Sequence, residues 1–183
     1  TYLAIQITVP RFSTELPEFA EAEKAVQARI DHLMGIKGKK SVDSIHKELG
    51  HIMWEYVGMG RTEEGLKTAL KLLKDIRKEF ETNLFIPGST EGVNIELEKA
   101  LRLNDFITMG ELIAYDALNR NESCGGHFRE EYQTEEGEAK RDDENYFYVS
   151  CWEYQGSDDV APVLYKEPLV YEAIKVQTRN YKS

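Results

Sequence analysis

Apolar residues recur at intervals of three and four along four long segments of this chain, and this spacing constrains the fold more than any other feature. It gathers the apolar side chains of each segment on one face of an α-helix. The segments are 16–34, 41–56, 62–80 and 94–121, and Ser41 and Thr62 are good N-cap residues for the second and third. The sequence therefore predicts a mainly α protein built around a helical bundle. The fourth segment is apolar on more than one side, which predicts a helix at the centre of the bundle.

The character of the chain changes after residue 121. A mostly charged stretch is followed by two runs rich in aromatic and β-branched residues, YFYVSCWEY from Tyr146 and VLYKEPLVYEAIKV from Val163. These runs predict two strands joined through GSDDVAP in a hairpin. Because two strands alone are barely stable, we expect the hairpin to lean on another surface, in this chain or in another domain. Residues 1–9, with apolar residues at alternate positions, predict a short strand.

The charge and composition restrict the partners and the setting. Asp and Glu number 33 against 23 Lys and Arg, a formal net charge of −10. Such a field repels phosphate backbones, so we expect no nucleic-acid partner. No apolar run approaches the roughly 20 residues that a bilayer-spanning helix requires, and two cysteines are too few for a disulfide framework, which favours a soluble protein of the reducing cytoplasm. The chain opens on Thr1 without a methionine, so we expect a piece of a longer polypeptide.

Three short motifs suggest sites but depart from the pattern that the chemistry requires. GRTEEGLKT, residues 60–68, lacks the lysine that follows the second glycine of a phosphate-binding loop, and it fits a helix start instead. His46 and His51 are five residues apart, so on a helix they point about 140° away from each other and do not share a zinc ion. CGGH supplies one thiol, Cys124, and one imidazole, His127, which are too few for a closed zinc site.

Two other classes of protein stay open on the residues alone. One is a thiol or metal enzyme that uses Cys124 and His127, since a thiol nucleophile paired with an imidazole base is a known arrangement. The other is a free-standing interaction module, whose gene would begin at or just before Thr1.

Two longer motifs resemble one protein family. NESCGGHFREEY, residues 121–132, followed by RDDENY, residues 141–146, resembles the signature ESRGAHxREDxP and RDDxNW. That signature lies near the C-terminal end of the flavoprotein subunit of succinate dehydrogenase and fumarate reductase, and L-aspartate oxidases share a version of it. MWEYVGMGRTEEGLKTAL, residues 53–70, is similar to the family's MWxxVGxxRxxxGL. The resemblance runs from about Pro17 to the end of the chain.

The sequence departs from the family pattern at four places. Cys124 stands where the family usually has arginine, Gly126 where it has alanine, and Tyr146 where it has tryptophan. Residues 135–140 lengthen the loop between the two halves of the signature. These departures indicate a subgroup of the family with a longer loop, and they put in doubt any ion pair made by the usual arginine.

The resemblance implies a C-terminal domain that is an antiparallel bundle of three to four helices, similar to a spectrin repeat. The parent enzyme then interconverts succinate and fumarate and is coupled to quinone in electron transport and the tricarboxylic acid cycle. A preceding Rossmann-type domain of the parent subunit then holds FAD. We therefore expect no catalytic, cofactor-binding or metal-ligating residue in this chain, and no activity of the chain alone.

The resemblance also implies partners and a division of the chain. The partners are the flavin domain of the same subunit, an iron–sulfur subunit and a membrane anchor subunit, and the location is cytoplasmic, at the inner face of the cytoplasmic membrane. Residues 1–15 are then a linker or a remnant of the flavin domain, 16–121 the helical bundle, and 122–183 the signature loop with a β-rich extension.

Six residues of the signature form the candidate site, with an interface or structural role. They are Gly125, Gly126, His127, Arg129, Asp142 and Asp143. The glycines turn the chain after the fourth helix, and Arg129 then offers a planar fork that suits a carboxylate, for which Asp142 or Asp143 is a candidate. We expect His127, Arg129, Asp142 and Asp143 to form a polar network that fixes the loop against the flavin domain. Direct contact with FAD or substrate is the alternative.

Overall fold

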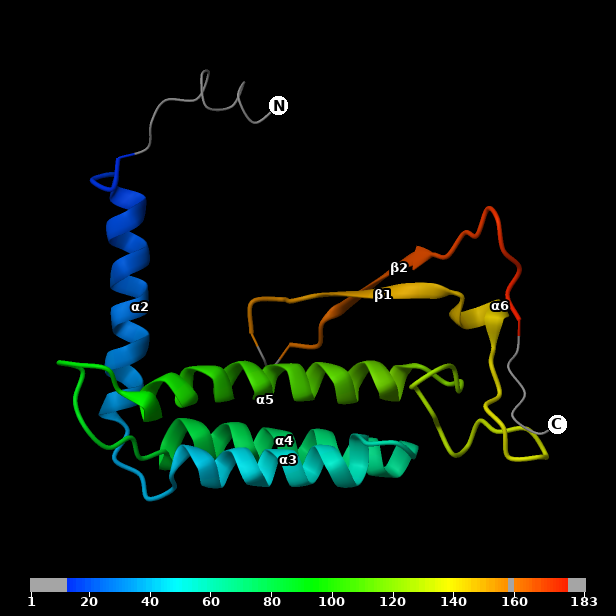
Figure 1. Ribbon diagram of the computed structural model, residues 1–183, viewed down its shortest axis with the longest axis horizontal. Coiled ribbons are helices and arrows are strands. Elements are labelled where there is room, and N and C mark those ends of the chain that lie inside the picture. Colours follow the sequence, from blue (N-terminus) through cyan, green and yellow to red (C-terminus); the bar gives the residue numbers. More distant parts are fainter. Residues whose placement is uncertain (1–12, 158–159, 178–183) are drawn as a thin grey trace.

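The computed structural model describes residues 13–157 and 160–177, and the strand expected at residues 1–9 lies outside them. The fold is mainly helical, with a bundle and a C-terminal antiparallel hairpin, as the sequence predicts (Figure 1). The elements are α2 (Pro17–Gly35), α3 (Val42–Val57), α4 (Glu63–Asn83), α5 (Ile95–Asn119), α6 (Asp143–Tyr146), β1 (Tyr148–Glu153) and β2 (Val163–Pro168). None of the described helices is both long and apolar enough to cross a bilayer.

Helices α3, α4 and α5 lie side by side, with consecutive helices antiparallel, and they enclose the core (Figure 1). Each contributes buried side chains: Ile45 and Leu49 from α3, Leu66, Ala69 and Leu73 from α4, and Leu103 and Ile107 from α5. Burial of a Leu or Ile side chain contributes about 1.5–3 kcal/mol relative to exposure, so this apolar seam is the main source of the bundle's stability.

Polar side chains fix where these helices begin. Ser41 Oγ accepts the N–H of Ser44 at 3.2 Å, and Thr62 Oγ1 accepts the N–H of Gly65 at 3.0 Å, so both predicted N-caps are confirmed. Asn94 caps α5 in the same way. α5 contacts α2, α3 and α4, which is the central position that the sequence predicts.

α2 stands apart from the other long helices. It rises away from the bundle, and only its C-terminal end touches α5 (Figure 1). Leu33 is its one buried residue, and Ile30 and Met34 pack against the core beside it. The amphipathic helix predicted for residues 16–34 is therefore present, but its apolar side chains before Ile30 are exposed.

The hairpin lies along α5 (Figure 1). β1 pairs antiparallel with β2, with Cys151 opposite Tyr165. Trp152 donates its indole N–H to Asp116 Oδ1 at 2.7 Å and meets the ring of Tyr115 edge-on at 5.1 Å between centroids. The expectation that the hairpin leans on another surface is thus met within the chain.

The second strand is shorter than predicted. The run from Val163 was expected to continue to Val176, but β2 ends at Pro168. Tyr148 is the residue that faces Pro168, and the residues before it, from Asp143 to Tyr146, form the short helix α6. Leu169 N still donates to Phe147 O at 3.1 Å, but the helical residues of α6 before Phe147 offer no strand with which the described residues beyond Leu169 could pair, whatever their β-propensity.

A polar clasp at the end of the bundle

The signature loop begins with a tight turn after α5. Cys124 and His127 exchange two backbone hydrogen bonds, from Cys124 N to His127 O at 2.8 Å and from His127 N to Cys124 O at 3.0 Å. Gly125 sits between them with φ of 59°, a conformation that favours glycine, whereas Gly126 has no positive φ and open space around it. α5 ends at Asn119, two residues before the expected end of the fourth helix, and the glycines turn the chain beyond it.

The loop is then joined to the connection between α3 and α4. Arg61 donates its backbone N–H to Phe128 O at 3.0 Å and accepts the N–H of Glu130 at 2.8 Å. These bonds place the two family-like motifs, more than 60 residues apart in sequence, side by side in the structure.

Arg129 lies at the centre of this arrangement, with only 1% of its surface exposed. Its Nη1 donates to Ala117 O at 3.0 Å and to Leu118 O at 3.4 Å, two carbonyls of the last turn of α5. These carbonyls have no partner within the helix, and a cation at a helix C-terminus also complements the helix dipole. The backbone N–H of Arg129 donates to Ser123 Oγ at 2.8 Å, and the Ser123 hydroxyl donates back to Arg129 O at 3.1 Å.

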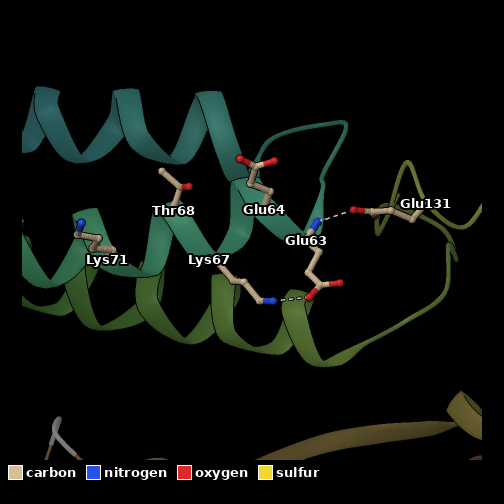
Figure 2. Close-up of a pocket in the computed structure, with 6 residues that line it drawn as sticks. All are labelled: Glu63, Glu64, Lys67, Thr68, Lys71 and Glu131. Atoms are coloured by element: carbon tan, nitrogen blue, oxygen red, sulfur yellow. Dashed lines mark hydrogen bonds and ion pairs between the residues drawn. The ribbon is translucent and has the colours of Figure 1, made fainter.

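The carboxylate that Arg129 meets is Glu131, not Asp142 or Asp143 as expected. Arg129 Nε donates to Glu131 Oε2 at 3.0 Å, and the other oxygen of Glu131 accepts the N–H of Glu63 in the first turn of α4 (Figure 2). Burial opposes ionisation of Glu131, but hydrogen bonds from backbone N–H groups and from Arg129 outweigh it and lower the pKa of this carboxyl. Glu131 therefore acts as a charged cap on α4.

Arg61 and His127 link the C-terminus of α3 to the end of α5. Arg61 Nε donates to Val57 O at 3.1 Å and Gly58 O at 3.2 Å, at the C-terminus of α3, and its Nη1 donates to His127 Nδ1 at 2.9 Å. His127 Nε2 then donates to Arg120 O at 2.9 Å, just past the end of α5. Because arginine only donates and a carbonyl only accepts, these bonds fix the neutral tautomer with the proton on Nε2.

The charge state of His127 agrees with this geometry. Burial lowers the pKa of His127, and the nearby guanidinium groups of Arg61, Arg129 and Arg120 lower it further, although the bond to Arg120 O acts in the opposite direction. Burial likewise lowers the pKa of Arg61. A neutral imidazole is thus held between an arginine and a carbonyl, and both of its nitrogens are occupied.

We call these residues the clasp: Arg61, Ser123, His127, Arg129 and Glu131. They bond the C-termini of α3 and α5 and the N-terminus of α4, so three helix ends are held by one polar network. Sequence reasoning found His127 and Arg129 but missed Arg61, Ser123 and Glu131, although all three lie inside the quoted motifs. Their signal was only their place in those motifs, because nothing local shows that residues 61 and 129 meet.

The two aspartates of the candidate site lie outside the clasp. Asp142 caps α6 by accepting the N–H of Asn145 at 3.2 Å, and its own backbone N–H donates to the buried carboxylate of Glu122 at 2.9 Å. Asp143 pairs with Arg141 at 2.5 Å. Of the four polar residues of the predicted site, His127 and Arg129 therefore belong to the clasp, whereas Asp142 and Asp143 make local bonds outside it.

The geometry does not favour chemistry at Cys124 and His127. The Cys124 thiol is exposed, and the ring nitrogens of His127 are bonded to Arg61 and Arg120, so the imidazole is not free to accept the thiol proton. Among residues 13–157 and 160–177, no group of three or more His, Cys, Asp or Glu side chains is arranged to hold a metal ion.

The N-terminus of α4 does not suit the phosphates of a nucleotide cofactor. This helix end already holds the carboxylate of Glu131, and Glu63 and Glu64 lie beside it (Figure 2). Three carboxylates would repel a pyrophosphate. What the clasp can do is hold the end of the bundle and present the tip of its loop.

Comparisons with known proteins agree with the two motifs. Residues 46–181 match the family model described as the fumarate reductase flavoprotein C-terminal domain. The chain is 31% identical over 112 residues to an uncharacterised FAD-dependent oxidoreductase of Methanocaldococcus jannaschii. The matched residues make up 61% of this chain and 20% of that protein. It is 37% identical over 88 residues to a chloroplastic L-aspartate oxidase of Nicotiana tabacum, covering 48% of this chain and 13% of that one.

A solved structure shares the fold. The quinol fumarate reductase of E. coli superposes with a TM-score of 0.70 at 21% identity, over 94% of this chain and 28% of that chain. This chain thus spans a fifth of its archaeal relative and little more than a quarter of the solved chain. The chain belongs to the fumarate reductase and succinate dehydrogenase flavoprotein C-terminal domain family.

Proposed function

We propose that this chain is the C-terminal helical domain of the flavoprotein subunit of a succinate dehydrogenase or fumarate reductase, and that it packs on the flavin-binding part of that subunit without catalysing the reaction. One observation carries the proposal: the polar side chains of the clasp are bonded to helix ends of this chain, and its central guanidinium is 1% exposed. A side chain so enclosed is a support for the fold and not a contact for FAD or a dicarboxylate.

The exposed part of the loop is then what the flavin-binding part meets. Cys124, Gly125 and Gly126 form the tip of the turn and are exposed, while the side chains behind them hold the tip in place. In this proposal residues 16–121 are the bundle and 122–183 the loop and extension, and FAD with its hydride chemistry belongs to the preceding part of the subunit. An iron–sulfur subunit and a membrane anchor subunit, which place the enzyme at the inner face of the cytoplasmic membrane, complete the proposed assembly.

The test is Arg129→Ala in the full-length subunit, with the ratio of FAD to protein and the rate of succinate oxidation per bound FAD as readouts. We expect FAD retention and assembly to fall, while the rate per FAD that remains is unchanged. Normal FAD content and assembly together with lost turnover would contradict the proposal and assign Arg129 to the reaction itself.

L-aspartate oxidase is a second candidate for the parent enzyme, because the tobacco protein of that name is 37% identical over its matched residues. The full-length protein separates the two, since a succinate dehydrogenase or fumarate reductase interconverts succinate and fumarate, whereas an L-aspartate oxidase oxidises L-aspartate. Comparison of the initial rates with the two substrates under identical conditions decides between them.

A further inference from the structure

His127 is the residue of the clasp whose charge can change near neutral pH. Its ring lies between two partners: Nδ1 accepts a hydrogen bond from Arg61 Nη1 at 2.9 Å, and Nε2 donates to Arg120 O at 2.9 Å. The imidazole therefore joins the connection between α3 and α4 to the end of α5, and it can do so only while Nδ1 carries no proton.

Protonation of His127 is incompatible with both bonds at once. Both nitrogens of an imidazolium are donors, so a proton on Nδ1 would face the donor group of Arg61. A half-turn of the ring about its bond to Cβ would replace the nitrogens by carbon atoms and lose both bonds. Arg61 cannot give up its proton, and its Nε is held by the carbonyls of Val57 and Gly58. A proton on the ring therefore separates His127 from Arg61.

Cations act on the ring from several segments of the chain. Arg61 belongs to the connection before α4, Arg120 follows α5, and Arg129 lies in the loop itself. Burial is the main cause that lowers the pKa of His127, and these guanidinium groups lower it further. The ring also lines a cleft of about 400 Å³, whose other charged or thiol-bearing residues are Arg120, Glu122, Cys124, Arg141, Asp143 and Lys175. This cleft connects the ring to solvent, which is the source of the proton.

The carboxylates around these cations do not compensate a charge on the ring. Each is bonded to another group: Asp116 to the indole of Trp152, Glu122 to Arg120, Glu131 to Arg129 and Asp143 to Arg141. None of these four carboxylates forms a hydrogen bond with the imidazole, whose two nitrogens are used by Arg61 and Arg120. A protonated His127 would thus be one more cation among arginines.

We propose that the clasp is an acid-sensitive latch: one proton taken up by His127 breaks its bond to Arg61 and opens the bridge between the signature loop and the connection before α4. The bridge is the pair of backbone bonds from Arg61 N to Phe128 O and from Glu130 N to Arg61 O. The bundle stays folded, because its apolar core does not include residues of the loop. The latch goes beyond the proposed function and does not depend on which enzyme the chain belongs to.

The size of the effect follows from the difference in proton affinity between the closed and the open clasp. A released imidazole titrates near pH 6.5, whereas the closed clasp resists protonation, so opening becomes more favourable as the pH falls below that value. Between pH 7.5 and 5.5 the open population rises by at most about tenfold.

The test is hydrogen exchange of the full-length polypeptide, resolved to single amides by mass spectrometry at pH 7.5 and 5.5. Each rate is divided by that of an unstructured peptide at the same pH, because intrinsic exchange itself depends on pH. The reporters are the amides of Arg61 and Glu130, and the amides of residues 69–73 in α4 are the reference for global unfolding. His127→Gln is the matched variant, since its amide offers an oxygen to Arg61 and an N–H to Arg120 O but does not titrate.

We expect the protection of both reporter amides to fall together by about five- to tenfold at pH 5.5, and by less than about twofold in His127→Gln. The α4 amides should exchange more slowly than the reporters at both pH values. Low concentrations of urea should speed exchange only of the α4 amides, because a local opening exposes little surface.

Three results would overturn the latch. The first is equal protection of the reporters at both pH values, and the second is an equal loss in His127→Gln, since another group would then sense the proton. The third is exchange of the reporters at the rate of the α4 amides, which would mean that the bridge opens only when the whole bundle unfolds. If His127→Gln does not fold, the pH and urea dependence of the unmodified protein still decides between a latch and global unfolding.

Discussion

Replacement of Arg129 is the strongest single perturbation of the clasp, because three acceptors lose the same guanidinium donor. In Arg129→Ala the carbonyls of Ala117 and Leu118 lose their guanidinium partner at the end of α5, and Glu131 loses its counter-ion. Removal of one partner of a buried ion pair costs about 3–5 kcal/mol. Glu131 is 38% exposed, so solvent screens that part of the loss, and we expect a decrease of about 3 kcal/mol in the free energy of unfolding.

The assay is urea denaturation followed by far-ultraviolet circular dichroism, with two further variants. Arg129→Lys keeps the charge but not the planar fork, so we expect an intermediate loss of about 1–2 kcal/mol. Arg102→Ala is the control, since this arginine pairs with Glu98 on the surface of α5 with 69% of its side chain exposed, and such pairs contribute at most about 0.5 kcal/mol. If Arg129→Ala were as stable as Arg102→Ala, the clasp would not hold the helix ends.

Two further predictions concern protonation and backbone packing. Since burial lowers the pKa of His127 in the fold, the unfolded chain binds the proton first as the pH falls below roughly 6.5, so stability is lost there, and His127→Gln should flatten the fall in Tm between pH 7.5 and 5.5. Gly38→Ala would place a Cβ 1.9 Å from the backbone carbonyl of Asn83, so we expect Tm to drop by at least about 5 °C, whereas Gly35→Ala, with no atom within 4 Å, should change it little.

The fold was largely predictable because its signals are local. Helical spacing and the hydroxyls of Ser41 and Thr62 act within a few residues, and both N-caps appear where the sequence indicates. The end of β2 was not predictable from its own residues, since it depends on α6 occupying the positions opposite. The sequence also could not show that the stripe of α2 would stay uncovered, because periodicity reveals an apolar face but not the surface that it meets.

The candidate site was predictable in part for the same reason. His127 and Arg129 were recognised from the motif, but their partners depend on the connection between α3 and α4, which reaches the loop only once the bundle has formed. Asp142 and Asp143 were plausible acceptors for Arg129 on the sequence alone. Glu131 binds Arg129 instead, and its other oxygen accepts the N–H of Glu63 at the N-terminus of α4. Competition among carboxylates is settled by tertiary geometry, which no spacing rule encodes.

The clasp also explains how the chain tolerates its departures from the family pattern. Cys124 contributes its backbone to the turn, through bonds to His127, and its exposed side chain makes none of the clasp contacts, so a cysteine in place of arginine leaves the network intact. The lengthened loop closes on itself, with Thr134 N bonded to Glu138 O at 2.8 Å and Gly137 at a φ of 82°, before Lys140 N returns to Tyr132 O. The departures from the family pattern fall at positions whose side chains make none of the clasp contacts. Ser123 is different, because its hydroxyl both donates to and accepts from Arg129, so a substitution there would break two clasp bonds.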